Sequence, residues 1–307
     1  MTLQQLKYVI SVVNYGSISE GAKQLFISQP SLSNAIKELE NELGIEIFNR
    51  SSRGITLSQD GIEFLGYARQ VVEQANLLED RYSSKKKVKQ LCSISTQHYA
   101  FAVTAFVEMI SSLENDEYEF TLRETRTSEI IDDVKNLHSE VGVLYINDFN
   151  EKVILKLLKE NQLVFHPLFT AEPHVFISAF HPLANESSVN FSQLEDYPFL
   201  CFEQGQNNSF YFSEEICSTE YHKKQIKVSD RATLFNLLKG LNGYTICSGV
   251  LGNDLNNGNI KAVPLETDEK MLVGWIENSK TSLSQMAKKY ISTLEKVIKE
   301  CGYILEN

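Results

Sequence analysis

Residues 17–40 read SISEGAKQLFISQPSLSNAIKELE, and this stretch decides the fold of the first part of the chain. Ser28 is a helix N-cap residue, and Pro30 sits in the first turn, where its missing N–H costs nothing. Apolar residues then recur at helical spacing until Gly44, which supplies a C-terminal stop. A short helix precedes this one, and a further helix over residues 3–13 precedes both. Three helices in this order predict a helix-turn-helix.

A hairpin and a long helix are expected next. Residues 45–48 alternate as a strand, residues 50–54 form a polar basic turn, and residues 55–57 return as a second strand. Over residues 59–82, apolar positions alternate between spacings of four and three, which is the period of a two-stranded coiled coil. This seam predicts dimerisation, although a helix packed on its own domain would show the same pattern. The seam consists of Phe64, Ala68, Val71, Ala75, Leu78 and Tyr82.

From residue 91 onwards, short strands and helices alternate, which is the βαβ signature of a parallel sheet. A first set has strands at 91–96, 120–123 and 141–146 and helices near 99–112 and 128–138. A second set has strands around 163–168, 174–179, 198–202, 224–228, 244–247, 260–264 and 271–276, with helices around 209–217, 231–241 and 283–300. We expect two α/β lobes with a ligand cleft between them.

Charge is distributed unevenly along the 307 residues. The net charge of −11 argues against nucleic acid, but residues 1–90 carry 11 Lys and Arg against 10 Asp and Glu, and the remainder carries 18 against 30. DNA phosphates respond to local potential within roughly 10 Å at physiological salt, so the near-neutral first part can bind DNA. The acidic remainder would oppose non-specific binding.

The cysteines and the lengths of the apolar runs indicate which other classes of protein this chain could belong to. Five scattered cysteines without a C-x-x-C pair suggest neither disulfides nor zinc, and no other metal or cofactor is expected. No long apolar run and no signal peptide is evident, so we expect a cytoplasmic protein without membrane contact. This also disfavours a solute-binding protein. No G-x-S-x-G elbow, phosphate-binding glycine loop or metal-spaced cluster indicates an enzyme.

The stretch over residues 17–40 resembles the LysR-type transcription regulators, as do LGIEIFNR at 43–50 and LSQDG at 57–61. Gly21, Ile47 and Ser58 depart from the usual alanine, leucine and threonine, which affects packing detail. The resemblance implies a winged helix-turn-helix over residues 1–58, a dimerisation linker helix and hinge over 59–90, and over 91–307 a two-lobed α/β effector domain like periplasmic binding proteins. This is an α plus α/β fold.

The same resemblance implies how such a protein works. A homodimer or homotetramer would bind a pseudo-palindromic operator in double-stranded DNA, activate a target operon and repress its own gene, with RNA polymerase as a further candidate partner. A small-molecule effector, expected to be an anionic metabolite or an amino-acid-related compound, would bind between the lobes. The segments QHYAFA at 97–102 and GIEFLGYARQ at 61–70 resemble Gram-positive regulators of methionine, cysteine and related sulfur metabolism.

A recognition helix needs short polar side chains near its N-terminus, so that its backbone can approach the major groove. The predicted DNA-contacting residues of this helix are Gln29, Pro30, Ser31, Ser33, Asn34 and Lys37. Leu32 is expected to serve the core instead. In the wing, Arg50, Ser51 and Arg53 suit phosphate or minor-groove contact. Taken alone, a Ser- and Asn-rich helix start could also be only a cap.

Candidate effector residues follow strand ends, where α/β folds hold ligands. They are Thr96, Gln97, His98, Tyr99, Thr125, Arg126, Thr127, Gln204, Gln206 and Asn207. An arginine there suits an anion, but each loop could equally be an ordinary helix cap, and His98 a structural histidine. A thiol redox switch through Cys201 and Cys217 is the alternative kind of sensing.

Overall fold

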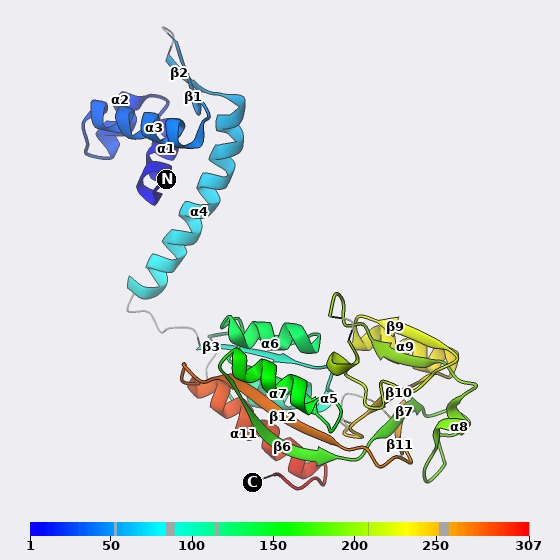
Figure 1. Ribbon diagram of the computed structural model, residues 1–307. Coiled ribbons are helices and arrows are strands. Elements are labelled where there is room, and N and C mark those ends of the chain that lie inside the picture. Colours follow the sequence, from blue (N-terminus) through cyan, green and yellow to red (C-terminus); the bar gives the residue numbers. More distant parts are fainter. Residues whose placement is uncertain (52–53, 84–89, 114–116, 208, 252–257, 307) are drawn as a thin grey trace. The chain divides into compact units, whose positions relative to one another are not determined.

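The computed structural model describes residues 1–51, 54–83, 90–113, 117–207, 209–251 and 258–306 (Figure 1). The chain divides into two compact units, Met1–Val88 and Lys89–Asn307. The sequence also predicts a polar basic domain linker at residues 83–87; Ser83 is the last residue of the long helix that precedes it, and residues 84–87 lie outside the described residues.

The first unit is a winged helix-turn-helix followed by a long helix. Its elements are α1 (Leu3–Tyr15), α2 (Ile18–Gln24), α3 (Gln29–Leu43), the antiparallel hairpin β1 (Phe48–Ser51) and β2 (Gly54–Leu57), and α4 (Gln59–Ser83). The predicted caps are present: Ser28 Oγ accepts the Ser31 N–H, and Gly44 adopts a φ of 70° at the end of α3. Leu32 is fully buried, as expected, beside Ile36 and Leu39.

The first wing strand begins later than predicted. Residues 45–47 are not a strand, because the Glu40 carboxylate accepts the N–H groups of Ile47 and Phe48 at 2.9 and 3.0 Å and holds the chain in a turn. Ile47 is buried in the helical core instead of alternating along a sheet. Gly61 lies against this turn, and a Cβ atom there would overlap the Ile47 carbonyl oxygen.

The second unit contains two five-stranded sheets, which form the two predicted lobes. The first sheet has the order β4-β3-β5-β12-β6, with β3, β4 and β5 parallel and β12 antiparallel to both neighbours. Its strands are β3 (Gln90–Thr96), β4 (Tyr118–Glu124), β5 (Val141–Ile146), β6 (Leu163–Ala171) and β12 (Met271–Asn278). Thus β6 and β12, from the second predicted set, complete the sheet of the first.

Helices cover both faces of the first sheet. Val143 of β5 packs in one apolar cluster with α5 (Ala100–Ser111) and α11 (Gln285–Glu300), whereas its neighbour Leu144 packs in another with α6 (Thr127–Lys135) and α7 (Glu151–Glu160). Because successive strand residues point to opposite faces, the two helix pairs lie on opposite sides. Helix α7 was not predicted, although its apolar residues Ile154 and Leu158 have helical spacing.

The second sheet has the order β11-β7-β10-β8-β9. Its strands are β7 (His174–Ser178), β8 (Phe199–Phe202), β9 (Gln225–Val228), β10 (Tyr244–Cys247) and β11 (Ile260–Pro264), accompanied by α8 (Phe191–Leu194) and α9 (Arg231–Leu241). The helix predicted near 209–217 is wrong: the segment forms only a 3-10 turn, Phe210–Phe212.

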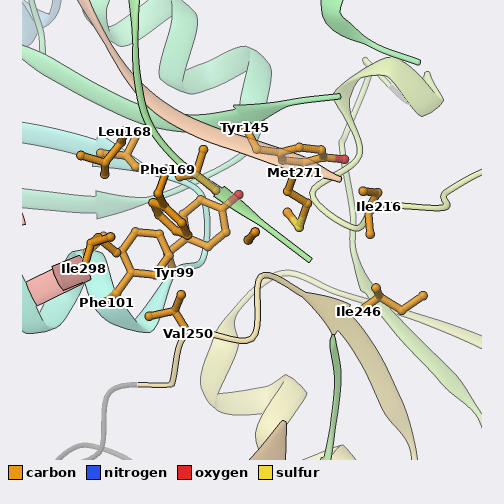
Figure 2. Close-up of a cluster of buried hydrophobic side chains, with 14 of the residues drawn as sticks. Tyr99, Phe101, Tyr145, Leu168, Phe169, Ile216, Ile246, Val250, Met271 and Ile298 are labelled. Atoms are coloured by element: carbon orange, nitrogen blue, oxygen red, sulfur yellow. The ribbon is translucent and has the colours of Figure 1, made fainter. Parts of the chain in front are cut away.

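The lobes share one apolar core. The chain passes from β6 to β7 and returns from β11 to β12, so two connections join the sheets. Figure 2 shows side chains of a single buried cluster that come from both sheets, Phe169 and Met271 from the first and Ile246 from the second. The two lobes therefore pack against each other through this shared apolar cluster.

Candidate nucleic-acid interface and inter-lobe cleft

Helix α3 has one buried apolar face and one exposed polar face. Leu32, Ile36 and Leu39 are fully buried, which turns the intervening positions outward. The predicted recognition residues on that outward side are Gln29, Pro30, Ser31, Asn34 and Lys37, all exposed, and the half-buried Ser33. The Ser31 hydroxyl is 2.7 Å from the capping hydroxyl of Ser28, so it also belongs to the cap.

Two of the three predicted wing residues lie in the described part of the hairpin. Arg50 and Ser51 lie in β1, where they pair with Ile55 and Gly54 of β2. Arg53 lies outside the described residues.

The seam of α4 divides into two parts. At the start of the helix, Phe64 packs on the helix-turn-helix core and Ala68 is 2% exposed, so these two residues serve their own unit. Further along, Val71 and Leu78 are 50% and 59% exposed, and Ala75 between them is half-buried. Tyr82 lies in the last turn of the helix.

In the second unit, the predicted effector residues after β3 are buried in a network within the first lobe. Gln97 is fully buried, and its Nε2 donates to Thr127 Oγ1 at 2.6 Å. Its Oε1 accepts the Tyr99 hydroxyl and the Tyr145 N–H at 2.8 and 3.1 Å. The Thr96 hydroxyl donates to the Gln97 carbonyl. This network fixes the loop that precedes α5.

The next residue, His98, reaches the second lobe. Its Nδ1 lies 2.8 Å from Glu214 Oε2, which also accepts the His98 backbone N–H at 3.0 Å. The imidazole stacks on Phe202 with ring centres 3.8 Å apart, and the two ionisable side chains are only 5% and 4% exposed. His98 is thus a buried contact between the lobes.

Two further ion pairs cross between the lobes. Arg126 donates through Nε to the Glu203 carbonyl at 3.2 Å and through Nη2 to the Glu203 carboxylate, and it also pairs with Glu129, which accepts the Thr125 hydroxyl. Arg231 at the start of α9 lies 3.2 Å from Glu124 at the end of β4. Gly205, with a φ of 57°, lies close to the Arg126 guanidinium, and a Cβ atom there would be 2.8 Å from Nη1.

Glu215 is the most perturbed acid of the junction. It is 2% exposed, and its carboxylate accepts the Phe202 N–H at 2.8 Å and the Ser213 hydroxyl at 3.1 Å. Burial, and secondly the charge of Glu214, raise the pKa of Glu215 to about 8. Burial also raises the pKa of Glu124. Adjacent glutamates within FSEEIC gave no periodic signal that would have singled them out.

A cavity of about 30 Å³ remains between these contacts. Its lining includes His98, Phe202, Glu214, Glu215 and Arg231. This volume suits one or two water molecules and is smaller than a metabolite. Of the other predicted residues, Gln204 is buried beside Glu214, whereas Gln206 and Asn207 are exposed.

Comparison with known proteins identifies the architecture. The family described as "Bacterial regulatory helix-turn-helix protein, lysR family" matches residues 3–62, and "LysR substrate binding domain" matches residues 100–296. The chain belongs to the LysR family. It is therefore a DNA-binding transcription regulator with an effector-binding domain, from a family whose members bind operators and small-molecule effectors and form oligomers.

Similar proteins come from several bacteria. The chain is 24% identical to the uncharacterized HTH-type transcriptional regulator YybE of Bacillus subtilis, over 67% of this chain and 68% of that protein. It is 26% identical to the hydrogen peroxide-inducible genes activator of Haemophilus influenzae, over 88% and 87%. A cysteine mutant of Corynebacterium glutamicum OxyR has the same fold, with a TM-score of 0.56, 17% identity and coverage of 98% and 94%. So does CbnR in complex with its target DNA, at a TM-score of 0.51, 16% identity and coverage of 97% and 100%.

Cys201 and Cys217, the two residues of the alternative redox switch, are both buried free cysteines. Burial raises the pKa values of Cys201 and Cys217 to about 12, so both thiols stay protonated at neutral pH. A protonated thiol is a poor nucleophile toward peroxide. Across the described residues, no cluster of His, Cys, Asp and Glu could hold a metal ion, and no helix is long and apolar enough to cross a membrane.

Proposed function

We propose that this LysR-family regulator reads its operator with the outward polar face of α3. The observation that carries the proposal is the division of this helix: Leu32, Ile36 and Leu39 are fully buried, and the exposed Pro30, Asn34 and Lys37 follow one another at spacings of four and three on the other side. Short side chains near the N-terminus let the backbone approach the groove, where an amide such as Asn34 can pair with a base edge.

The remaining parts of the first unit support two further roles. Arg50, Ser51 and Arg53 of the wing would contact phosphates beside the groove that α3 enters. The exposed Val71 and Leu78 of α4 would pair with a second copy, which places two recognition helices on a pseudo-palindromic site.

The second unit would act as the sensor, with its site between the lobes. The effector would enter where His98 and Arg126 of the first lobe and Arg231 of the second lobe now make contacts between the lobes, and its binding energy would shift the angle between the lobes. In this role the protein acts on the chromosome in the cytoplasm and catalyses no reaction.

Asn34→Ala tests the recognition helix. Using an operator that the full chain selects from a random duplex pool, we expect this variant to lose about 1–3 kcal/mol of specific binding and to relax the preference at one base pair. Gel shifts on the operator and on single-base variants measure both effects.

Asn185→Ala serves as the matched control, because this exposed asparagine lies in the second lobe, far from α3 along the chain. It should bind the operator as the unaltered chain does. If Asn34→Ala also keeps both affinity and base preference, α3 does not read the operator through this face.

A further inference from the structure

One aromatic side chain of the helix-turn-helix lies outside its core. Phe26 is in the turn between α2 and α3, and it is 96% exposed, more than any other large apolar residue in the part of the chain that the structure describes. Its neighbours Leu25 and Ile27 pack on the helix-turn-helix core. A phenyl ring stabilises a fold when it is buried, so the ring of Phe26 contributes little to the stability of this unit.

The backbone of Phe26 is also unfavourable for its residue type. Its φ of 53° lies in the left-handed region, which disfavours residues with a Cβ atom. The end of α2 fixes this conformation, because the Phe26 N–H donates to the Lys23 carbonyl at 3.2 Å. The Ile27 N–H donates to the Ala22 carbonyl at 3.1 Å. These bonds form a Schellman motif, whose left-handed position is usually a glycine. The turn itself therefore gives no reason for a phenylalanine.

The turn is continuous with the surface that we propose reads DNA. Phe26 precedes Ser28, the N-cap residue of α3, by two positions, and the exposed Gln29 follows in the first turn of the helix. In a helix-turn-helix, the first helix of the motif crosses the DNA backbone and the second enters the major groove. The turn that joins them then lies over the sugar–phosphate backbone at the edge of the groove, where the deoxyribose rings present apolar carbon atoms.

We propose that the ring of Phe26 packs on the sugar–phosphate backbone of the operator, beside the groove that α3 enters. The contact removes from water an apolar surface that is exposed in the free protein, and it strengthens binding without reading a base or neutralising a phosphate. This inference rests on the proposed role of α3, and it adds an apolar contact to the base contact of Asn34 and the phosphate contacts of the wing.

Phe26→Gly tests the contact, because it removes the ring and suits the left-handed backbone of the turn. We expect gel shifts with the full-length chain to show at least about tenfold weaker binding to the selected operator. The same factor should appear on each single-base variant of the operator, since the sugar is the same under every base. The salt dependence of binding should be unchanged, because no charged group that contacts a phosphate is lost.

Further variants and measurements separate the ring contact from a structural role. Phe26→Tyr keeps an aromatic ring and should retain most of the operator affinity. Phe180→Gly removes an aromatic side chain that is 89% exposed in the second unit, and it should bind the operator as the unaltered chain does. By circular dichroism, Phe26→Gly should unfold at an unchanged or higher temperature, because glycine accepts the left-handed backbone readily. Analytical ultracentrifugation should show unchanged self-association.

The other outcomes contradict the contact. Unchanged affinity of Phe26→Gly, an altered salt dependence, or a loss confined to operators with one particular base pair would overturn it. A similar loss in Phe26→Tyr or Phe180→Gly would show that the effect does not depend on this ring. A lower unfolding temperature or altered self-association would assign the ring to the fold or to a contact between copies. If the unaltered chain selects no duplex sequence, the proposed function fails and this contact with it, whereas failure of the Phe26 variants alone leaves reading by α3 intact.

Discussion

At the scale of single residues, Glu215 makes the stability of the second unit depend on pH. Burial raises its pKa to about 8, against 4.5 for an ordinary glutamate. Between these values the unfolded chain releases the proton and the folded chain keeps it, so stability is full below pH 4.5 and falls as pH rises to about 8. Each pH unit in this window costs about 1.4 kcal/mol.

Glu215→Gln should remove this loss. The variant should gain stability relative to the unaltered chain as pH rises from about 5 to 8, and the two should converge toward acid pH. Trp275 is the only tryptophan and lies in β12, so its fluorescence during urea unfolding reports on the second unit. Glu195→Gln is the matched control and should show no such trend. A constant difference at every pH would mean that Glu215 ionises normally.

At the scale of elements, the far half of α4 should hold two copies together. Val71 and Leu78 are 50% and 59% exposed and seven residues apart, which places them on one stripe of a heptad. Burying each against a second copy would contribute up to about 1.5–3 kcal/mol. We expect the double variant Val71→Gln, Leu78→Gln to raise the dimer dissociation constant at least about tenfold, as measured by analytical ultracentrifugation.

Glu73→Gln, at an exposed position between the two, is the control for a change in the polarity of the same helix, and its dissociation constant should match that of the unaltered chain. If the double variant associates equally well, the dimer contact lies elsewhere and the outward apolar residues of α4 have another role.

Sequence patterns predicted elements whose signals are local. The cap at Ser28, the stop at Gly44 and the inward Leu32 follow from neighbouring residues, and the structure confirms them. The start of β1 could not be predicted in this way, because a carboxylate on α3, Glu40, bonds the chain seven and eight residues later. Helix α7 was missed although its apolar spacing is regular.

The contacts in the inter-lobe cleft were even harder to predict from sequence patterns. The sequence predicted His98 and Arg126 as candidates from their position after strands, but their partners are 116 and 77 residues further along the chain. Only the folded arrangement of two sheets brings Glu214 and Glu203 to them. From the sequence, an arginine at a strand end suggested an anionic ligand. In the structure, the carboxylate of Glu203 already pairs with Arg126.

At the scale of the whole molecule, the part of the chain that binds DNA and the part that binds the effector differ in net charge. Residues 1–90 carry 11 Lys and Arg against 10 Asp and Glu, whereas the rest of the chain carries 18 against 30. A strongly negative body repels DNA phosphates at distances shorter than the Debye length, which is about 30 Å at 0.01 M salt and about 8 Å at 0.15 M. The second unit should therefore suppress non-specific binding by the first, and most strongly at low salt.

Residues 1–90 and the full-length chain can be compared on random-sequence duplex DNA at several salt concentrations. We expect the fragment to bind more tightly at low salt and the difference to shrink as salt rises, because screening removes the repulsion while the phosphate contacts of each helix-turn-helix are the same. Circular dichroism verifies that the fragment is folded, and ultracentrifugation allows each affinity to be expressed per dimer. Equal affinities at low salt would show that the acidic unit does not influence DNA binding through its charge, and weaker binding by the fragment would show that the second unit contributes contacts of its own.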